Sequence, residues 1–142
     1  MAKSKPNHNK HWDVYAVLHR EKVLLEKYYT GFRYFLSRAK LRCLFSIPSP
    51  TSDIKYKIEV EYAPPHAPKV RVVDPPLELN QKTHAYSDES LCLFYPGDLN
   101  WSYGSHHLYD KIIPWTAEWI VFYELYQITG HWEGPEAPHR IV

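Results

Sequence analysis

The stretch IKYKIEVEY, residues 54 to 62, alternates apolar and charged side chains along its whole length. A period of two residues is typical of a β-strand that has one face buried and the other in water. This is the clearest secondary-structure signal in the chain, so the fold has to accommodate a half-buried strand here. We predict that the inner face carries Ile54, Tyr56, Ile58, Val60 and Tyr62.

Shorter strand signals lie on both sides of this stretch. The segment FRYFLSRAKLRCLFSIPS, residues 32 to 49, predicts two strands, and alternation around Cys43 places that residue on the inward face of the second. We therefore expect Cys43 to be a buried structural thiol. The segment KVRVVDPPL predicts another strand that ends at Pro75-Pro76, because proline cannot donate to a strand ladder.

Two helices are predicted at the ends of this strand region. Residues 14 to 29 have apolar side chains near helical spacing, with Asp13 as a candidate N-cap and Gly31 as the stop. The segment PWTAEWIVFYELYQITG predicts a second helix, started by Pro114 and Thr116 and stopped by Gly130.

The second predicted helix is apolar nearly all round, with Glu118 and Glu124 as the main exceptions. Such a helix is expected to be largely covered by protein. Between the last strand and this helix, residues 77 to 100 show no strong period and predict a long irregular segment, which in a compact domain is often functional. The order of helix, four-stranded antiparallel meander, irregular loop and helix predicts an α+β fold.

Composition limits the function classes. The chain has 142 residues, which suits one domain, placed here at residues 13–142 after a flexible tail of residues 1–12. A formal net charge of +1 gives no sign of nucleic-acid binding, and no apolar run approaches the roughly 18 residues needed to span a membrane. The two cysteines form no Cys-x-x-Cys pair, and His106-His107 is an unfavourable spacing for one metal. We therefore expect no metal, cofactor, nucleic acid or membrane partner.

The middle of the chain resembles a known fold family. YKIEVEYAPPHAPKVRVVDPPL is similar to the strand, proline-rich turn and strand of ubiquitin-conjugating enzymes. In that resemblance His84 falls where the family's His-Pro-Asn motif begins, SLCL places Cys92 at the catalytic cysteine, and Trp101 falls where a tryptophan often follows. The resemblance implies the ubiquitin-conjugating (UBC-like) fold.

Two further passages narrow the resemblance. HAYSDESLCLFYPGDLNW and IIPWTAEWIVFYELYQITGHWEGPEAPH look like the stand-alone conjugating-enzyme-like proteins of short type II CBASS anti-phage operons, and the similarity runs from about Val14 to His139. Ala85 and Tyr86 depart from the motif, since Pro and Asn would stand there, and the spacing from His84 to Cys92 is shorter than usual. The passage HWEGPEAPH resembles a family hallmark and is expected to pack back over the active site.

The resemblance implies that Cys92 accepts an acyl group as a thioester and passes it to an amine. The competing interpretation is a buried, inert cysteine between two leucines. Tyr86 is a candidate donor to the oxyanion in place of the missing Asn, or a packing residue. His84 is expected to order the loop more than to react.

Asp88 and Asp98 lie on either side of Cys92 in the sequence. A carboxylate at either position could orient or deprotonate an incoming lysine. The alternative is that both serve turns, since SDES and PGD are rich in turn residues. Asp98 is kept among the candidate catalytic residues with Cys92, Tyr86 and His84.

By resemblance, the chain is a transferase in the bacterial cytoplasm that takes the C-terminus of a cGAS-like nucleotidyltransferase and joins it to a lysine. Whether a separate activating enzyme is needed stays open, because the sequence has no visible ATP-binding motif. The main alternative is a catalytically silent adaptor that binds the nucleotidyltransferase. A hydrolase or nuclease that uses His106 or His107 has less support, since clustered carboxylates and a basic face are missing.

Overall fold

The computed structural model describes residues 10–94 and 99–134 of the chain. A long N-terminal helix is followed by four strands, a largely irregular segment and a C-terminal helix. This order confirms the predicted α+β layout and agrees with a UBC-like fold. The elements are α1 (Lys10–Tyr28), β1 (Arg33–Leu36), β2 (Leu41–Pro48), β3 (Lys55–Tyr62), β4 (Lys69–Asp74), the short turns η2 (Gln81–Thr83) and η3 (Leu108–Ile112), and α2 (Ile113–Thr129).

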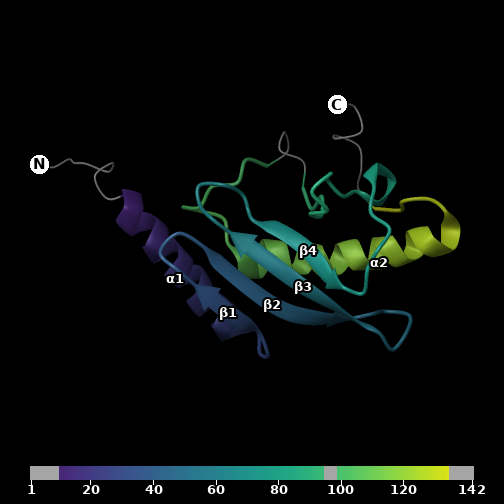
Figure 1. Ribbon diagram of the computed structural model, residues 1–142, viewed down its shortest axis with the longest axis horizontal. Coiled ribbons are helices and arrows are strands. Elements are labelled where there is room, and N and C mark those ends of the chain that lie inside the picture. Colours follow the sequence, from purple (N-terminus) through teal and green to yellow (C-terminus); the bar gives the residue numbers. More distant parts are fainter. Residues whose placement is uncertain (1–9, 95–98, 135–142) are drawn as a thin grey trace, which may run out of the picture.

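The four strands form one antiparallel sheet in the order β1-β2-β3-β4, as predicted for a meander. In Figure 1 the sheet lies in front of α2, and α1 runs beside β1. Cys43 pairs with Val60 across β2 and β3 and is fully buried, which confirms its predicted inward position. The inner face of β3 is likewise closed to solvent at Tyr56, Ile58, Val60 and Tyr62.

Ile54 does not share that inner face. It precedes β3, its side chain is 46% exposed, and its carbonyl accepts a hydrogen bond from the backbone N–H of Ser49 in the turn between β2 and β3. The prediction for this residue was wrong because the alternating pattern continues one position beyond the point where the chain leaves the sheet.

Helix α1 begins at Lys10 rather than at Val14. Asp13 therefore lies inside the helix and is not its N-cap, and residues 10–12 belong to the helix rather than to the predicted tail. Gly31 follows the helix with a φ of +81°, a conformation that glycine adopts without strain. That residue lets the chain turn from α1 into β1.

Helix α2 begins and ends close to the predicted points. Pro114 lies in its first turn, and Gly130 ends the helix in the left-handed conformation while its N–H donates to the carbonyl of Tyr126. Thr116 does not cap the helix. Its hydroxyl donates to the carbonyl of Ile112 at 2.7 Å, inside a continuous run that begins with the π-helical turn η3.

The prediction that α2 is largely covered holds for most of the helix but not for all of it. One face packs on the sheet, but Val121 and Ile128 on the other side are exposed. The buried face includes Glu124, whose carboxylate accepts hydrogen bonds from the hydroxyls of Ser49, Thr51 and Tyr56. Although burial alone raises a carboxyl pKa, these hydroxyl groups bring the pKa of Glu124 below its ordinary value. Glu124 thus binds α2 to the sheet.

No helix in the described ranges has the length and apolar character to cross a membrane.

Candidate active site around Cys92

The loop that carries Cys92 is fastened to the open edge of β4. The backbone N–H of Leu91 donates to the carbonyl of Val70 in β4 at 2.8 Å. Leu91 also pairs with Ala85 in an isolated antiparallel bridge, and the N–H of Cys92 donates to the carbonyl of His84 at 2.8 Å. The chain therefore folds back on itself between residues 84 and 92.

This reversal brings three of the predicted site residues together. The N–H of Tyr86 donates to the carbonyl of Ser90, which closes the turn at its far end. The hydroxyl of Tyr86 lies close enough to the Cys92 thiol that each group shifts the pKa of the other. The side chain of Tyr86 is still 44% exposed, so the pair lies at the surface of the domain and not in its core.

The two cysteines lie in different surroundings. Cys43 is fully buried, and burial is the main cause that raises its pKa to about 12. Cys92 is only partly buried. Burial raises the pKa of its thiol, and the hydrogen bond from Tyr86 acts in the opposite direction because it stabilises the thiolate. Cys92 is therefore the cysteine that solvent and a reaction partner can reach.

Tyr86 stays protonated near neutral pH. Burial raises the pKa of its hydroxyl, and its hydrogen bond to Cys92 raises the pKa further. A protonated phenol is a donor. It can therefore offer its proton to a negative charge that develops on or near the sulfur of Cys92.

His84 is a buried connector between the loop and α2. It is 4% exposed and has a φ of +55°, which is uncommon for a residue other than glycine. Its carbonyl accepts hydrogen bonds from Cys92 and from the indole N–H of Trp119, at 2.8 and 3.1 Å. Its ring stacks on Trp132 with centroids 4.7 Å apart. These contacts favour the loop-ordering role expected from the sequence.

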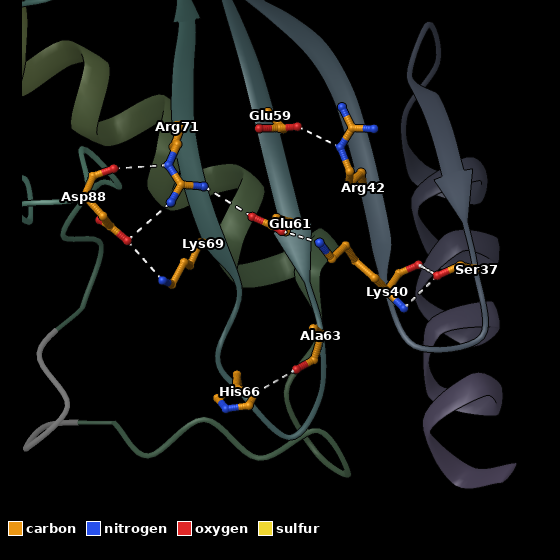
Figure 2. A network of polar contacts seen from close by, with 10 residues as sticks. All are labelled: Ser37, Lys40, Arg42, Glu59, Glu61, Ala63, His66, Lys69, Arg71 and Asp88. Atoms are coloured by element: carbon orange, nitrogen blue, oxygen red, sulfur yellow. Dashed lines mark hydrogen bonds and ion pairs between the residues drawn. The ribbon is translucent and has the colours of Figure 1, made fainter. Parts of the chain in front are cut away.

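Asp88 holds the turn between Tyr86 and Ser90. One carboxylate oxygen accepts from the N–H and the hydroxyl of Ser90, at 2.9 and 2.6 Å, and the other accepts from Lys69 and Arg71 of β4, at 3.0 and 3.3 Å. Figure 2 shows that Arg71 continues this chain of charges to Glu61. The bonds from Ser90, followed by Lys69, hold the pKa of Asp88 well below its usual range. Asp98 lies outside the described residues.

Cys92 also forms part of a pocket of about 60 Å³. The walls come from the Cys92 loop, from helix α2 and from the segment that follows α2. The lining residues are His84, Cys92, Leu93, Trp115, Glu118, Trp119, Phe122 and Trp132. The sequence predicts that HWEGPEAPH packs over the active site, and its Trp132 does line this pocket; the residues after Gly134 are outside the described range. Trp119 and Phe122 were not predicted, because apolar residues in a helix give no sign of which ones face a site.

The side chains of the adjacent residues His106 and His107 have different hydrogen-bond partners and do not form one site. The Nδ1 of His106 accepts from the N–H of Ser102 at 2.8 Å, whereas the Nδ1 of His107 lies 2.8 Å from a carboxylate oxygen of the buried Glu21. Among residues 10–94 and 99–134, no three His, Cys, Asp or Glu side chains are grouped so that they could hold a metal ion.

No curated protein matches the chain. A family model described as type II CBASS E2 protein matches residues 21–140, which is most of the 142 residues and includes the loop, the pocket and α2. The chain belongs to the family of type II CBASS E2 proteins.

Proposed function

We propose that this protein is a cysteine-dependent acyl carrier and transferase of the ubiquitin-conjugating type. The observation that carries the proposal is a partly exposed thiol beside a pocket, with the Tyr86 hydroxyl close enough that the two groups shift each other's pKa. In the first step the Cys92 thiolate attacks the activated C-terminal carbonyl of a donor protein. A carbon–sulfur bond forms, and the bond to the activating group breaks.

In the second step the amine of a lysine attacks the carbonyl of the thioester. A carbon–nitrogen bond forms, the carbon–sulfur bond breaks, and Cys92 leaves as the thiolate. Charge collects on the carbonyl oxygen in the intermediate, and the Tyr86 hydroxyl is the proposed donor to that oxygen. His84 is proposed to hold the backbone of Cys92 in place through its carbonyl.

The second step also needs a base that receives the proton of the attacking lysine amine, and a carboxylate can serve as that base. Both oxygens of Asp88 are already held by Ser90, Lys69 and Arg71, and its low pKa makes it a poor base. We propose Asp98, the other aspartate that flanks Cys92 in the sequence, for this role.

Membership of the CBASS family supports the choice of donor. We propose that the donor is the C-terminus of a cGAS-like nucleotidyltransferase of the same operon, and that the reaction takes place in the bacterial cytoplasm during antiviral signalling. The donor carboxyl has to arrive in an activated form, because amide and thioester formation from a free carboxylate both require activation. A separate activating enzyme is the simplest source.

One observation favours a second function. Burial raises the pKa of the Cys92 thiol, so the fraction of thiolate near neutral pH falls below that of a free cysteine. A silent adaptor that only binds the nucleotidyltransferase would not need a reactive thiol, and the altered His-Pro-Asn motif agrees with that function.

A gel experiment separates the two functions. The protein is co-expressed with the nucleotidyltransferase, with Cys92→Ser as the test variant and Cys43→Ser as the matched control. For a transferase, wild type and Cys43→Ser give an adduct that thiol reductant releases, and Cys92→Ser gives none or an ester that resists reductant. For an adaptor, the wild-type protein gives no covalent adduct, and the variant Cys92→Ser protects cells against phage as well as wild type does.

A further inference from the structure

We propose that Arg71 is a positioning residue for the Cys92 site. It fixes the turn of residues 86–90 on β4 and so keeps the Tyr86 hydroxyl beside the Cys92 thiol. This inference rests on the proposed function, because Tyr86 is the proposed donor to the oxyanion. It gives a role in the reaction to a charged side chain of the sheet that touches neither the thiol nor the incoming acyl group.

The turn of residues 86–90 contains a backbone conformation that needs support. Glu89 has a φ of +69°, in the left-handed region that residues with a side chain seldom adopt. Two backbone hydrogen bonds close the turn, from the N–H of Tyr86 to the carbonyl of Ser90 and from the N–H of Glu89 to the carbonyl of Tyr86. A strained conformation persists where its surroundings hold it, so contacts from outside the turn matter for its shape.

Arg71 supplies such contacts at Asp88, the residue before Glu89. Its Nε donates to the backbone carbonyl of Asp88 at 3.2 Å, and one terminal nitrogen donates to the Asp88 carboxylate at 3.3 Å. The other terminal nitrogen donates to Glu61 of β3 at 3.3 Å, as Figure 2 shows. The planar guanidinium is thus held by β3 on one side and holds the turn with its remaining donors.

The contact with the backbone distinguishes Arg71 from Lys69. Lys69 binds the carboxylate of Asp88 alone, and its side chain is 54% exposed against 30% for Arg71. An exposed ion pair of this kind contributes little by itself. A donor that also fixes the carbonyl of Asp88 limits where the main chain of the turn can lie.

Two consecutive residues of β4 hold the segment that contains both partners. The carbonyl of Val70 accepts a hydrogen bond from the N–H of Leu91, the residue before Cys92. Val70 is buried, and Arg71 points to the opposite face of the sheet, where it holds Asp88. Loss of Arg71 would therefore leave the Cys92 end attached to β4 and loosen the turn that begins with Tyr86.

The test measures how strongly Tyr86 acts on Cys92 with and without Arg71. Burial raises the pKa of the Cys92 thiol and Tyr86 lowers it, so Tyr86→Phe should move the pH profile of maleimide labelling to higher pH. Mass spectrometry of the Cys92 peptide gives this shift in the wild-type protein and in Arg71→Gln, Arg71→Lys and Arg42→Gln. Because the shift is taken within each background, the direct effect of each arginine substitution on the thiol cancels.

In the Arg71→Gln background we expect the shift caused by Tyr86→Phe largely to disappear, because the phenol no longer lies beside the thiol. Arg71→Lys keeps the positive charge but has one nitrogen in place of the fork, so the shift should be reduced there too. Arg42→Gln is the matched control. It removes another arginine of the same face, one that is paired with Glu59, and should keep the full shift. A merely structural role would lower the melting temperature of Arg71→Gln and leave the shift intact.

A shift of full size in either Arg71 variant would overturn the positioning role, and Arg71→Lys decides the matter even where Arg71→Gln does not fold. Absence of any shift in the wild-type protein would also overturn it, since Tyr86 would then have no effect on Cys92 for Arg71 to maintain. Maleimide labelling needs no donor protein, so these outcomes are independent of the carrier function, which the reductant-sensitive adduct of Cys92 tests separately.

Discussion

The Tyr86 hydroxyl lies close enough to the Cys92 thiol to shift its pKa, although six positions separate the two residues in the chain. The turn that Asp88 holds between Tyr86 and Ser90 makes this possible, because it reverses the chain between them. A phenol with a raised pKa faces a thiol with a raised pKa, so each group is protonated at neutral pH and the phenol is ready to stabilise a thiolate. The predictions below follow from this pair and from the groups that hold it.

The two thiols should differ in reactivity. We expect a maleimide to label Cys92 much faster than Cys43 in the folded protein, because Cys43 is fully buried and has a pKa of about 12. The labelling rate of Cys92 should keep rising above pH 8.5, the ordinary thiol pKa. Mass spectrometry of the labelled peptides measures both rates. Equal labelling of the two cysteines would contradict the assignment of the site.

Tyr86→Phe should separate loading from transfer. The variant lacks the hydroxyl that stabilises the thiolate, so the pKa of Cys92 should rise further and the maleimide profile should move to higher pH. Thioester should still form, whereas transfer to lysine should slow about a hundredfold or more, because one oxyanion donor is worth about 2.7–4 kcal/mol. Single-turnover transfer from the preformed thioester is the measurement. An unchanged transfer rate would return Tyr86 to a packing role.

Trp132 should control the order of the Cys92 loop through His84. Trp132→Ala removes the ring that stacks on His84, so we expect a lower melting temperature and faster maleimide labelling of Cys92. Trp132→Phe keeps an aromatic face and should restore most of the wild-type behaviour. Tyr28→Ala, which breaks an aromatic stack with Tyr109 far from this loop in sequence, is the control for general loss of stability. If Trp132→Ala and Tyr28→Ala change the labelling of Cys92 equally, His84 does not transmit the effect.

The ionised carboxylate of Asp88 should stabilise the folded protein at neutral pH and lose that effect in acid. Its folded-state pKa is lowered, so its contribution is complete above the unfolded pKa of about 3.9 and is lost as the pH falls toward the folded value. Asp88→Asn should therefore lower the melting temperature at pH 7, and the difference from wild type should shrink below pH 4. Asp53→Asn, in the turn between β2 and β3, is a matched substitution expected to cost less. A deficit for Asp88→Asn that stays constant down to the lowest pH would contradict this ionic role.

The strands were predictable from sequence because alternation reports directly on which side of a sheet a residue faces. The same rule identified Cys43 as buried, whereas the resemblance to conjugating enzymes made Cys92 the candidate nucleophile. The rule was wrong at Ile54, because the alternating pattern of side chains begins one residue before the strand β3 does.

The site was less predictable because it depends on contacts between distant segments. The sequence predicts that HWEGPEAPH packs over the active site but not that its Trp132 stacks on His84. Nothing in the sequence indicates that three hydroxyls satisfy Glu124 inside the domain. The partial exposure of α2 also escaped prediction, since Val121 and Ile128 are as apolar as the residues that the sheet covers.

The bond from Leu91 to Val70 has a consequence for solubility. β4 is an outer strand, and an outer strand with unpaired backbone groups can pair with another molecule and seed aggregation. The loop that presents Cys92 occupies part of that edge. A substitution that unfolds this loop therefore exposes unpaired backbone groups of β4 as well as displacing the thiol. Purified variants of the loop should be checked for self-association before a loss of activity is attributed to the chemistry of Cys92.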